Sequence, residues 1–522
     1  MGEADQKPKN KVRLDRSVFW ISLIVLILVS SLLLLNPKSS LSTLENMRQF
    51  MTHDLGWLFL GFVFGGLGWL IWLALSRHGA VCFGDLDEGP AYSNISWFGM
   101  LFCAGIGSNL LYFGTTEWIG YSLDPSPLSG ASPGSPEAAD WAGAYSFFHW
   151  GIAAWATYAI ATLPIAYILH IRRSNTLRIS TACDAVLGKH AKGPLGKCID
   201  ILFIFGLVGG VATSLGIGIP MISAVASDIF GVERGLALDT AILIGLTIMF
   251  SISVSAGLDK GIKRLSDINV GLAIVLLAFL LFSGPTSFII NQAFDSLGVM
   301  FQNFLELSLY TGAGDSSSFA QDNTIFFWAW WLAWAPFMGL FIARISKGRT
   351  IRQVVFGVVG GGSLGCWVGF AILGHSTMHL LQSEHPEIST LVQQAKETNT
   401  GVDAPQIMVE LLHAQPFAIV VSIVFFMLSF IFVATSLDSA AFTIAATASK
   451  DLPPEGQPPR WHRLVWAFVL GGTALSLMIL GGLEVLRAAS VVVGLPLVFV
   501  VAIMMWSLMR NLNKTGPGAP PG

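Results

Sequence analysis

The stretch Ile325-Phe-Phe-Trp-Ala-Trp-Trp-Leu-Ala-Trp-Ala-Pro-Phe-Met-Gly-Leu-Phe-Ile-Ala343 contains no charged side chain, and Arg344 follows it directly. A helix of about 20 apolar residues is long enough to cross the ~30 Å hydrocarbon core of a bilayer. Comparable runs recur along the 522-residue chain, which is 53% hydrophobic and only 12% charged. This composition argues against a water-soluble protein and predicts an all-α polytopic membrane protein.

We expect twelve transmembrane helices, because about a dozen apolar runs are long enough to span a bilayer. Two other segments, 291–310 and 377–412, mix apolar residues with many polar ones and are predicted as helices on the outer surface. The predicted spans start near Val18, Leu55, Ser96, Ala142, Asp200, Leu238, Ile268, Ile325, Gln353, Pro416, His462 and Arg487.

The positions of Lys and Arg predict the orientation of these spans, since cytoplasmic loops of membrane proteins are enriched in both. Basic residues gather in segments 7–16, 172–197, 260–264 and 344–352, which alternate with the other loops. Segments 115–140 and 287–324 contain acids, Glu117 among them, but no Lys or Arg. We therefore expect these two segments to be outside loops and both termini to be cytoplasmic.

The span count also suggests an internal architecture. Spans three to seven and eight to twelve form two halves of five, and halves with an odd number of spans insert with opposite orientations, as in transporters built from inverted repeats. The predicted division is a cytoplasmic tail at 1–17, a two-helix preface with its loop at 18–95, a first repeat at 96–284, an external amphipathic helix and loop at 285–324, a second repeat at 325–511 and a short cytoplasmic tail at 512–522.

Span three contains closely spaced glycines in Gly105-Ile106-Gly107-Ser108-Asn109. Glycine has the most backbone freedom to lose, so this spacing is unfavourable for a continuous helix. A break here would offer backbone amides to a carboxylate and carbonyls to a cation. The alternative is that the glycines only allow neighbouring helices to pack closely.

Two spans carry unusual aromatic residues. Span four contains Trp150, Trp155 and Tyr158, and span eight contains Trp330, Trp331 and Trp334. Indole faces attract cations, so these six side chains could surround a quaternary ammonium group. The alternative is a belt of Trp and Tyr at the membrane interface, which suits Trp328 in the first turn of the span but not Trp334, because ten residues of helix place Trp334 ~13 Å inside the span.

Span ten places Thr435, Ser436 and Asp438 in an otherwise apolar helix. Hydroxyl and carbonyl oxygens suit a hard cation, although most intramembrane Thr and Ser bond back to their own helix. An ionisable group such as Asp438 at this depth is expected to have a partner or a role. The hydrolase-like string Gly361-Gly362-Ser363-Leu364-Gly365 lies inside an apolar span instead of a strand-to-helix turn, so it does not indicate an enzyme.

The strings 148–158, 328–352 and 435–439 resemble those of the betaine/choline/carnitine transporter family. The resemblance implies twelve spans in a leucine-transporter-type inverted repeat, a homotrimer, and uptake of trimethylammonium or related compatible solutes. It assigns the six aromatic residues, with Gly105, Gly107 and Asn109, to the substrate. In sodium-coupled members the ion site corresponds here to carbonyls of Cys103, Ile106 and Phe432 and to hydroxyls of Thr435 and Ser436.

From these features we predict a secondary active transporter in a bacterial-type inner membrane that imports a betaine-type zwitterion with sodium by alternating access. Neither an enzymatic activity, nor a cofactor other than the coupling ion, nor a nucleic-acid partner is expected. Two alternatives stay open: a sodium-independent exchanger of the carnitine/γ-butyrobetaine type, and proton-coupled uptake of choline or a sulfonium analogue. Asn109 stands where choline-selecting members resemble one another in an Asp, and Asn269 where exchangers have an Arg, which favours a zwitterion and sodium.

Overall fold

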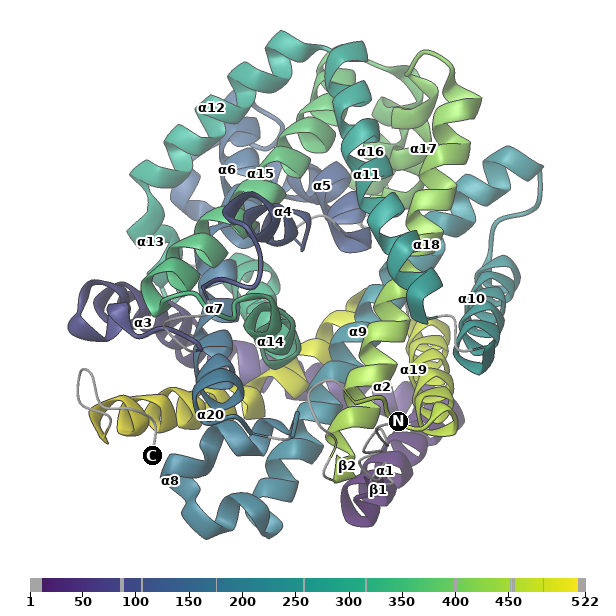
Figure 1. The fold of residues 1–522 in the computed structure, drawn as a ribbon. Coiled ribbons are helices and arrows are strands. Elements are labelled where there is room, and N and C mark those ends of the chain that lie inside the picture. The colour runs from purple at the N-terminus through teal and green to yellow at the C-terminus, as the bar shows by residue number, and fades with distance from the viewer. Residues whose placement is uncertain are drawn as a thin grey trace, which may run out of the picture.

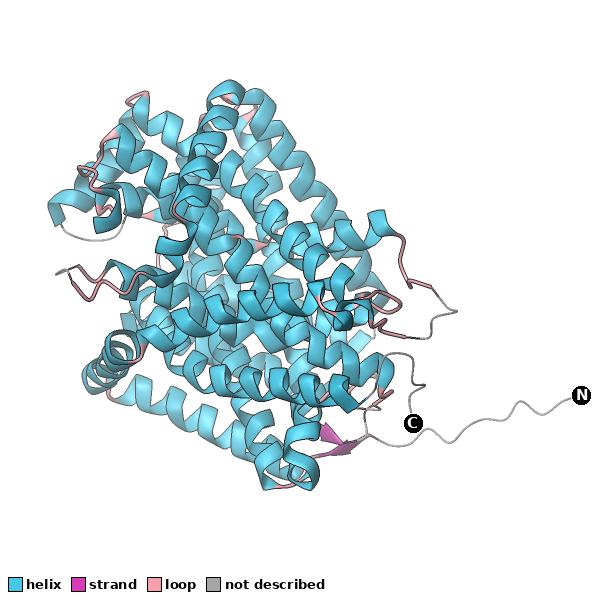
Figure 2. Ribbon diagram, turned by 90° about the vertical axis from the view of Figure 1, so that its left-hand side faces the viewer, coloured by secondary structure: helices cyan, strands magenta, loops and turns pink. Residues whose placement is uncertain are grey.

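The computed structural model describes residues 12–84, 89–104, 107–174, 176–256, 259–314, 317–398, 402–450, 452, 456–481 and 483–514. Helices make up nearly all of this part of the chain, as the cyan ribbon in Figure 2 shows. The strands within it are two short antiparallel segments, β1 (Arg13–Leu14) and β2 (Ser449–Lys450). The predicted all-α polytopic class is confirmed.

Among the described residues, nine helical segments are long and apolar enough to cross a membrane, or eleven if two bent pairs each count as one span. A shorter apolar stretch, Leu236–Ile252 within α10 (Leu236–Ala256), lies where the sequence predicts span six. The number twelve and the inverted repeat stay predictions. The helices at the predicted spans are α1 (Arg16–Leu35), α3 (Gly56–Leu75), α4 (Asn94–Ala104) with α5 (Ser108–Leu123), α6 (Pro136–Trp150) with α7 (Ile152–Ala166), α9 (Pro194–Phe230), α10, α11 (Asp259–Ser283), α14 (Phe326–Ile345), α15 (Ile351–Gln382), α18 (Ala418–Thr447), α19 (Arg460–Gly481) and α20 (Leu483–Lys514).

The predicted outer segments are helical too. Segment 291–310 falls in α12 (Thr286–Gln302) and α13 (Phe304–Leu309), and α12 turns by 105° from the end of α11. Segment 377–412 holds the end of α15, then α16 (Pro386–Thr398) and α17 (Ala404–His413). The remaining short helices are α2 (Pro37–Gln49), η1 (Phe50–Asp54), η2 (Arg77–Ala80), η3 (Pro127–Ser129), η4 (Tyr167–Ile171), η5 (Ile179–Cys183), α8 (Asp184–Leu187), η6 (Gly188–Lys192) and η7 (Ala320–Ile325).

The outside loop predicted at 115–140 is shorter in the structure. Helix α5 continues to Leu123, and the hydroxyls of Thr115 and Thr116 bond back to carbonyls one turn earlier within it. Helix α6 begins already at Pro136, where the Ser135 side chain caps it by accepting from the Ala138 amide. The prediction that Glu117 lies in an outside loop is therefore wrong: it is a buried residue within α5.

The helices that carry the predicted site residues surround the middle of the molecule (Figure 1). Helix α14 packs along α7 and also contacts α9 and α20, and α15 packs on α4, α5, α6 and α7. Helix α9 joins this group to α18. The two spans with aromatic strings are thus direct neighbours, although more than 150 residues separate Trp155 from Trp331 in the chain.

A compact joint connects the loop after α3 with the corner between α14 and α15. The Gly348 amide donates to the Phe83 carbonyl at 2.6 Å, and Cys82 forms an isolated antiparallel bridge with Thr350. The guanidinium carbon of Arg349 lies 4.0 Å from the centre of the Trp97 ring of α4, and Arg349 Nη1 donates to Asn94 Oδ1 at 2.9 Å. We call this contact region, residues 81–84 with 346–351 and the start of α4, the corner joint.

Candidate functional site

Span three is divided into two helices at its glycines. Helix α4 ends at Ala104, α5 begins at Ser108, and the two are inclined by 56°. Gly107 has an extended backbone, and a Cβ added to it would meet nothing within 4 Å. Gly105 and Ile106, which the sequence assigns to the substrate and to the ion, lie outside the described residues. Helix α5 therefore starts beside the cavity described below, and the backbone amides of its first turn lie there. This agrees with the predicted break in span three.

Span four is also interrupted, which the sequence did not indicate. Helix α6 ends at Trp150 and α7 begins at Ile152, with Gly151 between them. A Cβ on Gly151 would lie 2.5 Å from the Phe147 carbonyl oxygen and 2.6 Å from Trp367 Nε1, so the site requires glycine. Trp367 Nε1 donates to that Phe147 carbonyl at 2.8 Å and satisfies it at the end of α6. Span four is therefore built from two helices, and not from one continuous helix as a single predicted span implies.

Five of the six predicted aromatic side chains form one connected group. Trp150 meets Trp331 edge to face at 5.0 Å between ring centres and Trp330 at 6.1 Å. Tyr158 meets Trp331 at 5.2 Å and Trp155 at 5.4 Å. We call Trp150, Trp155, Tyr158, Trp330 and Trp331 the aromatic cluster. All five are at least 94% buried, and Trp331 is the most exposed at 6%. Side chains of an interfacial belt face the lipid head groups, so these five residues do not form such a belt.

Trp334 lies on the same cavity but apart from the aromatic cluster. Its ring pairs with Phe337 at 5.4 Å and faces Gly210 of α9, whose added Cβ would come within 2.9 Å of Trp334 Nε1. This indole N–H has no hydrogen-bond partner in the described part of the chain. The structure therefore places all six predicted aromatic residues on one site, with Trp334 separate from the packed five.

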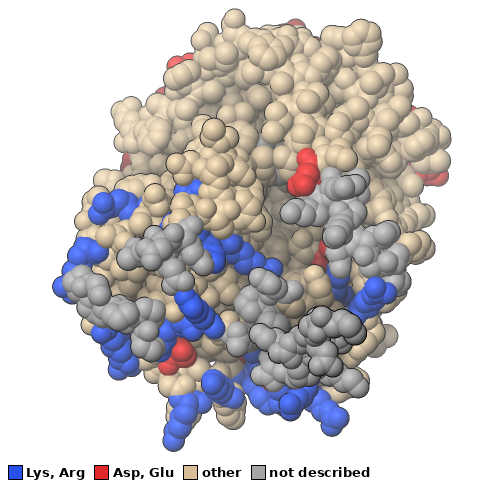
Figure 3. Space-filling view, in the orientation of Figure 1, with Lys and Arg blue, Asp and Glu red and all other residues tan. Residues whose placement is uncertain are grey.

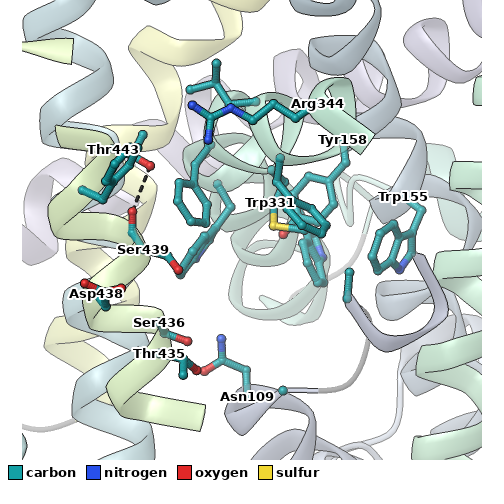
Figure 4. Close-up of a pocket in the computed structure, with 18 of the residues that line it drawn as sticks. Asn109, Trp155, Tyr158, Trp331, Arg344, Thr435, Ser436, Asp438, Ser439 and Thr443 are labelled. Atoms are coloured by element: carbon teal, nitrogen blue, oxygen red, sulfur yellow. Dashed lines mark hydrogen bonds between the residues drawn. The ribbon is translucent and has the colours of Figure 1, made fainter. Parts of the chain in front are cut away.

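A cavity of about 570 Å³ connects these residues. Figure 4 shows the aromatic side chains on one side of it and the polar residues of α18 on the other. Figure 3 shows a hollow near the centre of the face seen in Figure 1, with Lys and Arg gathered over the region of α1, α8 and β1. The lining includes Gly107, Asn109, Trp150, Trp155, Tyr158, Trp330, Trp331, Trp334, Phe337, Phe341, Arg344, Cys366, Thr435, Ser436, Asp438, Ser439, Phe442 and Thr443.

The predicted ion ligands are only partly gathered at this cavity. Thr435 and Ser436 line it, and Phe432 lies one turn earlier on α18. Thr435 Oγ1 donates to the carbonyls of Ile431 at 3.0 Å and Phe432 at 3.1 Å. The hydroxyl thus bonds back to its helix, as the alternative interpretation predicted, yet its lone pairs stay available to a cation. Cys103 is half-buried near the end of α4.

Asn109 faces these hydroxyls. Its Nδ2 donates to Ser214 Oγ of α9 at 2.9 Å, while its Oδ1 is buried and has no hydrogen-bond partner in the described residues. Figure 4 shows the Asn109 amide directed toward Thr435 and Ser436. A buried oxygen without a donor is costly unless something else binds it. The set of amide, hydroxyl and backbone oxygens is the kind that a hard monovalent cation uses.

Comparison with known proteins decides the family. A family model described as "BCCT, betaine/carnitine/choline family transporter" matches residues 17–517. The chain belongs to the betaine/carnitine/choline transporter family. It is therefore a transporter and not an enzyme, as the absence of a recognisable nucleophile or metal motif in the sequence predicted.

Relatives of this transporter carry names that differ in substrate. The glycine betaine transporter OpuD of Bacillus subtilis is 35% identical over 95% of this chain and 94% of its own. The ectoine/hydroxyectoine transporter of Virgibacillus pantothenticus is 34% identical, with 97% and 98% covered. The carnitine transporter of Acinetobacter baumannii is 31% identical, with 96% and 90% covered. These are bacterial proteins, and the many apolar helices of this transporter identify it as a multi-pass membrane protein.

In this transporter Asp438 has the partner that its depth requires. Asp438 Oδ1 and Arg463 Nη2 of α19 are 2.6 Å apart, and the Arg463 residue is 4% exposed. Arg463 and Arg344 also lie over the Phe442 ring, at 5.7 and 5.8 Å. The carboxylate therefore joins α18 to α19 at the wall of the cavity.

The sequence missed two residues of this transporter's site. Glu117 accepts a hydrogen bond from Trp150 Nε1 at 2.8 Å, and Ser214 binds Asn109. Glu117 follows two threonines near the end of an apolar run. An outside loop begins with the same kind of polar and acidic residues, so the pattern of charges predicted a loop where the structure has a helix. Ser214 is one of several small residues on α9 and carries no signal of its own in the sequence.

Proposed function

We propose that this transporter imports a betaine-type zwitterion, a trimethylammonium compound with a carboxylate or a close analogue, together with sodium by alternating access. The observation that carries the proposal is the shared cavity wall of the aromatic cluster and Trp334. Several indole faces compensate a quaternary ammonium ion for its lost water, at ~2 kcal/mol or more for each desolvated ring. The names of the relatives include glycine betaine and carnitine, which both carry this head group.

The carboxylate end of such a substrate has a complementary group on the other side of the cavity. Helix α5 begins at the cavity with Gly107, and helix N-termini bind carboxylates through their free amides and their dipole. Within the described part of the chain, a Cβ added to Gly107 would meet no atom within 4 Å apart from its chain neighbours, which leaves room for a ligand there. A zwitterion therefore fits better than a bare cation such as choline, whose far end has no charge to place there.

Coupling to sodium is supported by the oxygens of Thr435, Ser436 and Asn109. The unpartnered Asn109 Oδ1 beside two hydroxyls is the feature that fits a cation. Inward movement of one positive charge supplies ~2.3 kcal/mol per 100 mV of membrane potential, which is enough to concentrate a solute. We also propose a homotrimer in the bacterial inner membrane with both termini in the cytoplasm, which rests on the family resemblance and on the alternation of basic loops.

Transport assays with the purified protein in liposomes test this function. Betaine, carnitine, ectoine, choline and dimethylsulfoniopropionate are offered under an inward sodium gradient with a negative interior potential. We expect accumulation of a zwitterion, and its loss when sodium is replaced by potassium outside. If accumulation needs no sodium but requires substrate preloaded inside the liposomes, the protein is an exchanger. If a pH gradient drives accumulation, uptake is coupled to protons. Either result would reject the sodium proposal.

A further inference from the structure

A buried polar network lies behind the aromatic cluster. Glu117 of α5 accepts hydrogen bonds from Trp150 Nε1 at 2.8 Å and from the Tyr121 hydroxyl at 2.7 Å, one on each carboxylate oxygen. His149 Nδ1 lies 2.9 Å from the Tyr121 hydroxyl and 3.3 Å from Glu117 Oε1. His149 Nε2 lies 3.0 Å from the Thr324 hydroxyl of η7. The network thus joins α5, α6 and the segment that leads into α14.

One arrangement of protons satisfies all of these groups. Trp150 and Tyr121 donate to Glu117, Nδ1–H of a neutral His149 donates to Tyr121, and Thr324 donates to His149 Nε2. In this arrangement Glu117 acts only as an acceptor.

The network holds two rings of the aromatic cluster. Glu117 fixes Trp150 through its indole N–H, and the backbone carbonyl of His149 accepts from Trp331 Nε1 at 2.9 Å. These two rings meet edge to face at an interplanar angle of 87°. Glu117 itself does not belong to the cavity lining, so any effect on substrate must pass through Trp150.

We propose that Glu117 is the positioning residue of the substrate site, and that its hydrogen bond to Trp150 sets the affinity for the onium head group. This inference rests on the proposed function. Through this hydrogen bond the carboxyl group orients the indole, so that the ring face is presented to the cation. Arg487 of α20 is a basic residue within electrostatic range of Glu117, and its guanidinium carbon lies 5.2 Å from the Phe326 ring centre.

Binding measurements on the full-length transporter in nanodiscs test this. Glycine betaine is titrated into the wild type, Glu117→Gln, Trp150→Phe and the double variant. Trp150→Phe keeps an aromatic face and the carboxylate but removes the indole N–H, so it tests the same bond if Glu117→Gln does not fold. The matched control is Glu410→Gln, since Glu410 is equally buried, accepts from Gln406 Nε2 at 2.9 Å and does not line the cavity.

We expect each single variant to bind betaine about tenfold more weakly, the loss expected for removal of one buried hydrogen bond. The double variant should bind no more than about twofold more weakly than the poorer single variant, because both remove one interaction. In liposomes the KM for uptake should rise as much as the Kd while kcat stays within about twofold, which a general loss of folding would not produce.

Three outcomes would overturn the proposal: Glu117→Gln binding betaine as Glu410→Gln does, losses that multiply in the double variant, or a fall in kcat with KM unchanged. A failure of the proposed function is a different result, because the wild type would then bind none of the betaine-type compounds. The two failures are therefore separated by the wild-type titration.

Discussion

Replacing Trp334 with Leu is the most direct test of the onium site. Trp334 is the one predicted aromatic residue that lies apart from the aromatic cluster, with Phe337 as its ring partner. Its indole N–H has no partner in the described residues, so removing the ring leaves no buried acceptor unsatisfied. Trp331 differs, because Trp331→Leu would leave the His149 carbonyl without its donor.

The size of the effect follows from this position. Loss of one desolvated cation–π contact costs ~2 kcal/mol. Since each 1.4 kcal/mol corresponds to a factor of ten, the apparent substrate constant should rise about 30-fold. The protein should fold normally, because Trp334 is only partly buried and Leu retains apolar contact with Phe337.

Concentration-dependent uptake of labelled glycine betaine, with surface expression measured in parallel, gives the readout. Trp506→Leu is the matched control, because Trp506 of α20 is 60% exposed on the protein surface and does not line the cavity. An unchanged substrate constant in Trp334→Leu, at normal expression, would refute the reasoning. An equal rise in the control would show that loss of any indole, and not the site, is responsible.

Three further changes have defined outcomes. Thr435→Val should raise the sodium concentration for half-maximal uptake at least about tenfold, and an unaltered sodium dependence would contradict this ligand assignment. Asp438→Asn removes the carboxylate charge that lies 2.6 Å from the buried Arg463 guanidinium, so thermal unfolding should show a loss of about 3 kcal/mol, which Asp438→Asn/Arg463→Met should largely restore. Burial raises the pKa of Asp15, but the charge and hydrogen bond of Arg178 at 3.0 Å outweigh this and hold the pKa below its usual value. A depressed pKa stabilises the fold above the pKa of the unfolded state, so the wild type should melt above Asp15→Asn by a constant margin from pH 7 to about pH 5 and lose that margin as the pH falls below about 4; a margin that persists at lower pH would contradict the ion pair.

Much of the helical framework could be predicted from the sequence. A bilayer imposes a minimum length on each apolar run, so α3 begins at Gly56 beside the predicted Leu55, and α18 at Ala418 beside Pro416. The aromatic residues were predictable for a similar reason. Indoles ten residues inside an apolar helix are too deep for the interface, which leaves a buried site as their use.

The interactions across the site were not predictable, because their partners are distant in the chain. Glu117 is held by Trp150, 33 residues away. Asp438 is paired with Arg463, 25 residues away. The interruption at Gly151 depends on Trp367 of α15, which supplies the donor that the end of α6 lacks. Hydropathy and helical spacing contain no information about contacts between residues that are distant in the chain. For this reason the sequence predicts a loop at Glu117 and a single helix for span four.

The corner joint limits how the cavity can change shape. Arg349 is 2% exposed and is bonded to both Asn94 and the Tyr92 carbonyl, and the Trp97 indole donates to Ser346 at 3.1 Å. The first turns of α4 are therefore fastened to the α14–α15 corner. Any motion that widens this end of the cavity must therefore move the start of α4 and the α14–α15 corner together, as one rigid unit.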